Sequence, residues 1–231
     1  MDLLSERRSE REDRILETAR RLIAERGYDG VGMRELASQS RVSVPTLYNL
    51  FGDKSALLIR AVELQFRELL ASIDRHSKGT GTDLLLAIPA GCTRALLRAP
   101  QYAKAVLGVF SQSGQRSGVI SIVAEITAGQ FEIALARMSE EEDLESWVDP
   151  RALGQRLASH QIMVCLEWAG GHLNAIELKA AMLYGPCMMV MGAVREGARE
   201  VLEDQARTSQ ENSRTRQQDA PRPDPSSTKA H

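Results

Sequence analysis

The stretch RVSVPTLYNLFGDK, residues 41–54, places several different side-chain chemistries in a fixed order. Ser43 stands before an apolar helical pattern, where a hydroxyl can cap a helix. Pro45 falls in the first turn, where a missing N–H costs nothing because those groups have no partner inside the helix. Gly52 then breaks the pattern. The stretch therefore predicts a short helix over 44–50 that begins after Ser43.

The residues before this stretch predict two further helices. Apolar side chains recur at helical spacing over 10–26, and Gly27 follows at a position suited to a left-handed helix end. Residues 33–40 form a second short pattern, and residues 41–43 are left as a tight turn between it and the helix over 44–50. Two short helices joined by such a turn have the arrangement of a helix-turn-helix, which binds DNA through its second helix.

The side chains of the second short helix suit a DNA contact. The free N–H groups after Ser43 favour a phosphate, and small apolar surface at Val44 and Pro45 suits a thymine methyl. Hydroxyl groups reach phosphate oxygens, an amide reaches a base edge, and a lysine adds charge beside the same strand. The residues that we predict to contact DNA are Arg34, Arg41, Ser43, Val44, Pro45, Thr46, Tyr48, Asn49 and Lys54.

Residues 14–58 closely resemble the N-terminal domain of the TetR family of bacterial transcriptional regulators. The matching parts are the first helix with its Gly-Tyr end, Leu36-Ala37, Val42-Ser43, Thr46-Leu47-Tyr48, Phe51, and Lys54 before Leu57-Leu58. The resemblance implies a homodimer that places two recognition helices on a double-stranded, palindromic DNA operator. It also implies a divergent C-terminal domain that binds a small-molecule effector and dimerises, with repression relieved by the effector as the family default.

Two positions depart from the family pattern. Arg41 stands where glycine is typical, so we expect a left-handed residue with a strain of about 1 kcal/mol. Gly32 stands where a Ser or Thr cap is usual, which removes one expected phosphate contact.

Composition sets the class of the whole chain. It has 231 residues, 43% of them hydrophobic and 4% aromatic, and its net charge of −2 does not by itself indicate a nucleic-acid partner. Its three cysteines lack a metal or disulfide spacing and are predicted to be reduced core thiols. The longest nearly uncharged run, 182–194, is too short to cross a bilayer of about 30 Å. With no signal sequence, the expected location is the cytoplasm, away from membranes.

Helical spacing continues through the rest of the chain and predicts an all-α fold. Further helices are expected over 54–76, 83–98, 100–111, 118–138, 149–169 and 174–206. We divide the chain into a helix-turn-helix DNA-binding domain (8–54), an all-helical ligand-binding and dimerisation domain (55–206) and a disordered tail (207–231). The helix over 54–76 would transmit effector binding to the recognition helices, changing operator affinity by roughly 5- to 150-fold.

The C-terminal domain offers candidate residues but no motif. Aromatic or polar side chains on predicted core helices could line an effector pocket: Tyr102, Phe110, Phe131 and His160. The last two long helices are apolar on more than one face, which suggests that a second subunit covers them. The proposed dimer contacts are Val164, Trp168, Met182, Gly185 and Met189. The histidines and Cys165 are not spaced as metal ligands, so no metal or other cofactor is expected.

Two other classes of protein are alternatives to a regulator. An all-α enzyme would need a nucleophile–base pair, a phosphate loop or a metal-binding motif, and the sequence has none. A helical protein-interaction module could keep the three-helix arrangement without binding DNA. Salt-dependent DNA binding distinguishes it from a regulator.

Overall fold

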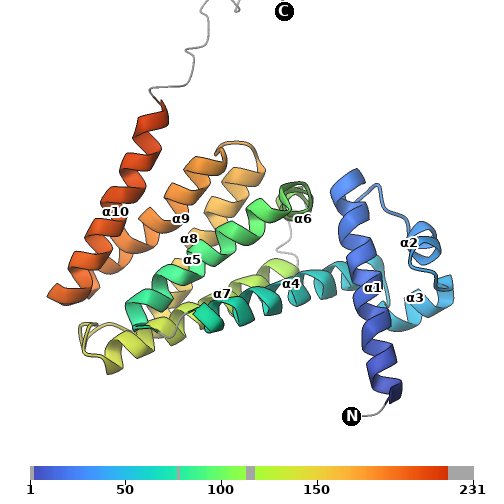
Figure 1. Cartoon of the computed structure of the whole chain (residues 1–231), viewed down its shortest axis with the longest axis horizontal. Coiled ribbons are helices and arrows are strands. Elements are labelled where there is room, and N and C mark those ends of the chain that lie inside the picture. Colours follow the sequence, from blue (N-terminus) through green and yellow to red (C-terminus); the bar gives the residue numbers. More distant parts are fainter. Residues whose placement is uncertain (1–2, 77–78, 113–117, 218–231) are drawn as a thin grey trace, which may run out of the picture.

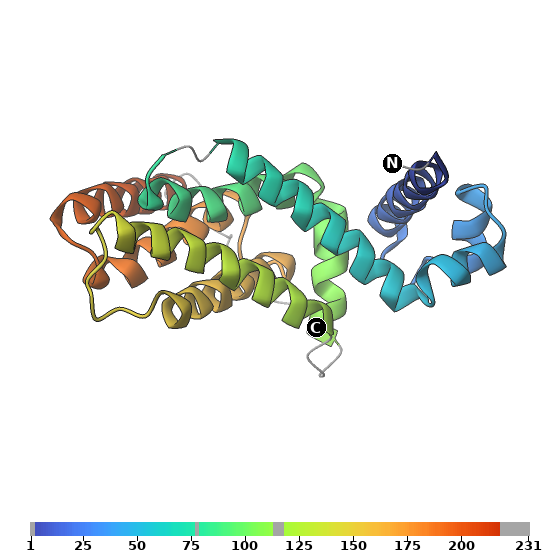
Figure 2. The same ribbon diagram turned by 90° about the horizontal axis from the view of Figure 1, so that it is seen from below.

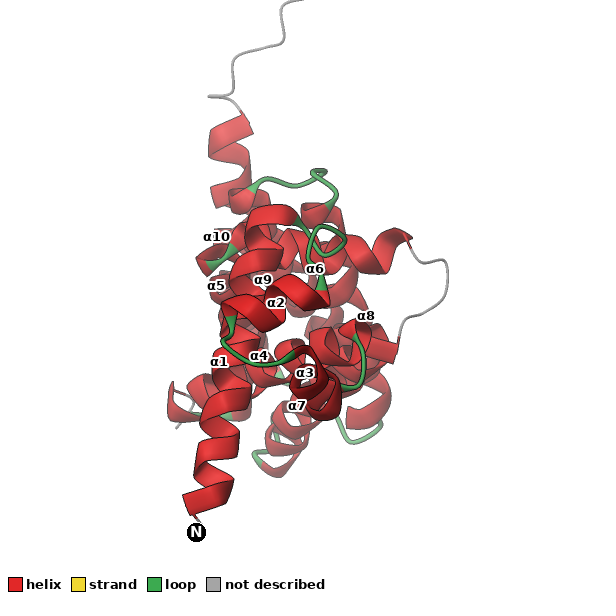
Figure 3. Ribbon diagram, turned by 90° about the vertical axis from the view of Figure 1, so that its right-hand side faces the viewer, coloured by secondary structure: helices red, strands yellow, loops and turns green. Residues whose placement is uncertain are grey.

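The computed structural model describes residues 3–76, 79–112 and 118–217. Within these ranges the regular structure is helical (Figure 3), with one isolated antiparallel bridge between Leu144 and Val194. The predicted all-α fold is confirmed.

Three helices form one end of the molecule (Figure 1): α1 (Leu3–Arg26), α2 (Met33–Gln39) and α3 (Val44–Phe51). They enclose a core in which Ile15, Leu22 and Leu47 are each fully buried. Gly27 ends α1 in the left-handed region, with φ 73°, as predicted. The helix α1 begins seven residues earlier than Glu10, where we expected it to start, so its first turns extend beyond this core.

The long helix α4 (Lys54–His76) leads from this end into the rest of the molecule (Figure 2). A carboxylate oxygen of Asp53 accepts the Ala56 N–H at 2.7 Å and caps its first turn. Arg20 of α1 donates from Nη2 to the carbonyl oxygen of Ala61 at 3.2 Å. This bond ties the three-helix end to α4 two turns after α4 begins.

The remaining helices pack into a bundle: α5 (Gly81–Arg98), α6 (Pro100–Gln112), α7 (Gly118–Glu140), α8 (Pro150–Ala169), α9 (Ala175–Val190) and α10 (Glu196–Gln217). The helix α5 starts at Gly81, two residues before its expected start at 83, because Thr80 and Asp83 form a reciprocal capping box. The expected starts of α8 and α9 are confirmed, with Asp149 and Asn174 as their N-caps.

The expected single helix over 174–206 is wrong. It divides into α9, a short 3₁₀ turn (Met191–Ala193) and α10, because Val194 adopts an extended backbone with φ −117° and ψ 154°. Backbone hydrogen bonds from the loop after α7 stabilise this interruption between α9 and α10. The Glu145 N–H donates to the Ala193 carbonyl at 2.9 Å, and the Arg195 N–H donates to the Asp143 carbonyl at 2.9 Å.

The proposed disordered tail begins too early. Residues 207–217 continue α10, which packs against α9 with Ala206 and Ser209 only 4% and 3% exposed. Burying these small residues extends the helix through a segment whose polar composition indicated disorder. Residues 218–231 lie outside the described part of the chain.

Candidate nucleic-acid interface and inner cavity

The helix α3 begins with the predicted serine cap. The Ser43 hydroxyl oxygen accepts the Thr46 N–H at 3.2 Å, and the two hydroxyl oxygens lie 2.7 Å apart. Ser43 has an extended backbone, and Pro45 occupies the first turn of the helix. The remaining N–H groups and the positive end of the helix dipole are available to an anion at this point.

One side of α3 is packed and the other is open. Leu47 and Phe51 face the core, at 0% and 8% exposed, whereas Pro45, Tyr48 and Asn49 are exposed. Tyr48 keeps 47% of its surface in solvent, although it is one of few aromatic residues in the chain. Figure 3 looks at the molecule from the end that carries α2 and α3. The outer side of α3 therefore presents a proline, a phenol and an amide together.

The two departures from the family pattern lie at the starts of the two short helices, Arg41 in the turn before α3 and Gly32 before α2. Arg41 has φ 56°, so the expected left-handed arginine is confirmed. Its side chain and that of Arg34 are exposed. Gly32 stands at the N-cap of α2 without a side-chain hydrogen bond, as its missing side chain requires.

Lys54 is positioned by an aromatic ring. Its Nζ lies 4.2 Å from the centre of the Tyr28 ring, a favourable cation–π arrangement. The Tyr28 hydroxyl oxygen is in turn 3.3 Å from that of Ser55. Partial burial lowers the pKa of Lys54, and the nearby Asp29 carboxylate acts in the opposite direction.

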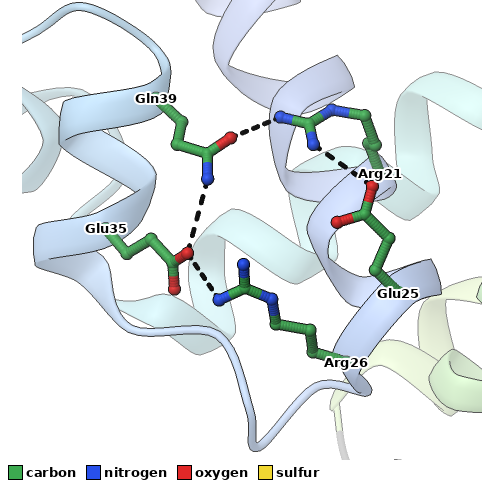
Figure 4. Close-up of polar contacts among 5 residues, drawn as sticks. All are labelled: Arg21, Glu25, Arg26, Glu35 and Gln39. Carbon is green, nitrogen blue, oxygen red and sulfur yellow. Dashed lines mark hydrogen bonds and ion pairs between the residues drawn. The ribbon is translucent and has the colours of Figure 1, made fainter.

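A polar network joins α1 to α2 (Figure 4). Arg26 Nη1 donates to Glu35 Oε1 at 2.6 Å, and Gln39 Nε2 donates to the same oxygen at 3.4 Å. Arg21 bonds to Gln39 and, at 3.2 Å, to Glu25. Exposed pairs of this kind each contribute only about 0–1 kcal/mol, so the network orients α2 on α1 more than it stabilises the fold. No sequence pattern predicted these contacts between the two helices.

A small inner cavity lies between α4, α5, α6, α7 and α8, with a volume of about 90 Å³. Its described lining is apolar apart from the side chains of Gln65, Tyr102, Thr127 and Gln161 and the thiols of Cys92 and Cys165. Gln161 is 4% exposed, and its Oε1 accepts no hydrogen bond within the described residues. An unsatisfied buried oxygen at a cavity wall is open to a ligand donor.

Two side chains that line the cavity, Tyr102 and Cys165, have raised pKa values. Burial raises the pKa of Tyr102 to about 12, against the opposing effect of the Arg20 guanidinium beside it. A hydrogen bond with the Cys92 thiol, together with burial, raises the pKa of Cys165. All three cysteines are buried and free, as predicted.

Comparison with known proteins identifies the family. Residues 15–61 match the family described as "Bacterial regulatory proteins, tetR family". The chain is 30% identical over 145 residues to the HTH-type transcriptional repressor KstR of Mycolicibacterium smegmatis (strain ATCC 700084 / mc(2)155), covering 62% of this chain and 71% of that protein. The KstR of Mycobacterium tuberculosis (strain ATCC 25618 / H37Rv) is 31% identical over 146 residues, covering 62% and 66%. The chain belongs to the TetR family.

Solved structures of TetR-family proteins share the fold. A TetR transcription regulator from Haloarcula marismortui ATCC 43049 superposes with a TM-score of 0.65 at 14% identity, covering 81% of this chain and all of that one. The chain is thus a DNA-binding transcriptional regulator, with α2 and α3 as its helix-turn-helix.

The predicted effector residues are only partly brought together. Tyr102 lines the inner cavity. Phe131 does not line the cavity and is 0% exposed in the core between α5, α7 and α9. His160 does not line it either, since its ring packs against Gly185 on α9. The side chain of Phe110 lies outside the described residues. Sequence spacing could not find Gln161 and Thr127, because they meet Tyr102 only through the packing of three helices.

The predicted dimer residues are mostly interior. Val164, Trp168 and Met182 are at most 3% exposed within the chain's own core, which explains their apolar surroundings without a partner. Gly185 is half-buried beside His160. Met189 is 38% exposed, and the neighbouring exposed methionines of α8 and α9 are Met163 at 56% and Met188 at 47%.

Among the described residues, no group of three or more His, Cys, Asp or Glu side chains is placed to hold a metal ion. None of the described helices has the length and apolar character needed to cross a membrane.

Proposed function

We propose that this regulator is a repressor that binds a palindromic operator as a homodimer and is released by a small-molecule effector. The observation that carries the proposal is the outer side of α3, where Pro45, Tyr48 and Asn49 are exposed beyond a serine-capped N-terminus. Exposed polar and apolar groups at the start of a recognition helix are what a major-groove contact requires. The two KstR relatives are named as transcriptional repressors.

The roles of the side chains follow their chemistry. Ser43, Thr46, Tyr48 and Lys54 would bind phosphate oxygens and fix the register of α3, as would the exposed guanidinium groups of Arg34 and Arg41. Val44, Pro45 and Asn49 would face the base edges. We propose residues 8–54 as the DNA-binding domain and the helices that follow as the effector and dimer domain.

The dimer is proposed to form through α8 and α9. Met163, Met188 and Met189 place exposed apolar surface on these adjacent helices, and each is more than a third exposed. Exposed apolar patches of this kind favour a second subunit, and a twofold axis would bring the same surface of each copy together.

Two substitutions test the DNA-contact assignments on a selected operator. Tyr48→Phe removes only a hydroxyl and should weaken binding to all sequences alike, whereas Asn49→Ala should relax the preference at one base position by about 1–3 kcal/mol. Tyr184→Phe, on α9, is the matched control and should leave binding unchanged. Wild-type binding by both α3 variants would contradict the assignment of Tyr48 and Asn49 to the DNA contact.

A further inference from the structure

A second hollow adjoins the inner cavity and opens towards α1. This cleft has a volume of about 730 Å³ and lies between α1, α4, α5 and α6. It shares Gln65, Ala95 and Tyr102 with the inner cavity, so the two hollows meet at these side chains. Figure 1 shows α6 beside α1, and both helices contribute side chains to the lining of this cleft.

The cleft and the cavity differ in charge. The described lining of the cleft contains Arg20, Arg21, Arg94 and Arg98, with one carboxylate, Glu17. No charged side chain is found among the described residues that line the inner cavity. The combined space is therefore apolar at its inner end and strongly positive at its mouth.

Within the described part of the chain, two of the four arginines take part in no ion pair. Arg20 bonds to Glu17 and Ala61, and Arg21 bonds to α1 and α2 side chains. By contrast, Arg94 and Arg98 on α5 are exposed, and neither has an ion pair with any described residue. Like charges gathered at one cleft without acidic partners repel one another, and an anion would relieve that repulsion.

We propose that the effector is an anionic amphiphile, with its apolar body in the inner cavity and its carboxylate or phosphate in the arginine cleft. This inference rests on the proposed effector-controlled function and specifies the class of effector. Arginine guanidinium groups bind both anions through paired hydrogen bonds. The Oε1 of Gln161 provides an acceptor for a donor group carried on the apolar body.

The position of the cleft provides a route to the DNA-binding end. Its walls come from α1, which carries Arg20 and Arg21, and from α5, which carries Arg94 and Arg98. A head group that contacts both walls has a different affinity for each placement of α1 relative to α5. Such differential binding is what shifts a regulator between two states.

The test uses probes that share an octyl chain and differ in head group: octyl phosphate, octanoate, octanol and octylammonium. Binding is measured on the full chain by titration calorimetry, without DNA. The test variant is Arg94→Gln/Arg98→Gln, and the matched control is Arg151→Gln/Arg156→Gln, which removes two exposed arginines from α8. All four positions are exposed, so both variants should fold.

We expect octyl phosphate and octanoate to bind the wild-type protein and the control variant with the same affinity. They should bind the test variant at least about tenfold more weakly, because it loses the charge-assisted hydrogen bonds of two arginines. Stronger binding of octyl phosphate than octanoate would identify a phosphate head, and the reverse a carboxylate. Equal binding of octanol or octylammonium, or unchanged anion binding by the test variant, would overturn the inference. If the protein binds the anions but no operator, the proposed function is contradicted, while the inferred class of ligand is still supported.

Discussion

The Nζ of Lys54 lies 4.2 Å from the centre of the Tyr28 ring, so the first residue of α4 is held against the second residue after the end of α1. The contact limits the freedom of a long side chain without neutralising its charge. A cation held in this way at the junction of α3 and α4 is prepared for a phosphate before DNA arrives, which lowers the entropy cost of the contact.

Replacing Lys54 should change the salt dependence of DNA binding. Lys54→Gln is expected to weaken binding about equally for all sequences and to reduce the slope of log affinity against log salt by about 1.8, because each subunit of the dimer loses one phosphate contact. Titration of operator and unrelated DNA at several salt concentrations measures both. Lys179→Gln, an exposed substitution on α9, should leave the slope unchanged. An unchanged slope in Lys54→Gln would remove this residue from the interface.

The left-handed backbone at Arg41 predicts an unusual stabilisation. Arg41→Gly should raise the free energy of unfolding by about 1 kcal/mol, because glycine adopts φ 56° without strain. Arg41→Val should lower it, since a β-branched residue is disfavoured there. Urea unfolding gives both values. A glycine variant less stable than wild type would mean that the arginine side chain has a stabilising contact that outweighs the strain.

The crossing of α5 and α7 depends on Gly81. A Cβ there would lie 2.5 Å from the backbone nitrogen of Met138, so Gly81→Ala should destabilise the protein by about 1–3 kcal/mol. Gly129, inside α7, has nothing within 4 Å of such an atom, and Gly129→Ala should stabilise by about 1 kcal/mol. Thermal unfolding of the two variants should shift in opposite directions, and shifts of the same sign would contradict this packing.

The contact between α8 and α9 predicts coupling between two residues. An added Cβ at Gly185 would lie 1.9 Å from His160 Nε2, so Gly185→Ala should cost about 1–3 kcal/mol of stability. In a His160→Ala background the obstacle is removed and most of that cost should disappear. A double-mutant cycle measures the coupling directly. Additive effects would place the histidine ring elsewhere.

Tyr102 should make stability depend on alkaline pH. Burial raises its pKa from 10.0 to about 12, so between these values the unfolded chain loses a proton that the folded chain keeps. Its contribution is complete below pH 10 and falls by about 1.4 kcal/mol for each pH unit up to about pH 12. Tyr102→Phe should flatten this part of the curve relative to wild type. Identical slopes in urea unfolding would contradict the assignment.

Local features were predictable from sequence and long-range contacts were not. The cap at Ser43, the left-handed Arg41 and the inward Leu47 follow from residue type and spacing, which depend on neighbours in the chain. The break in the helix after Val190 could not be predicted in this way, because the extended backbone at Val194 is held by the distant Leu144. Likewise, three dimer candidates belong to the interior, since an apolar helix looks the same whether its own chain or a partner covers it.

The most direct test of the account is selection of bound fragments from genomic DNA with the purified protein, followed by titration of the best fragment at two salt concentrations. We predict a palindrome with half-sites about one helical turn apart, bound more tightly than unrelated DNA by a factor above about 10³. Weak binding that is independent of sequence at both salt concentrations would contradict the assignment of α3 as an operator-reading helix.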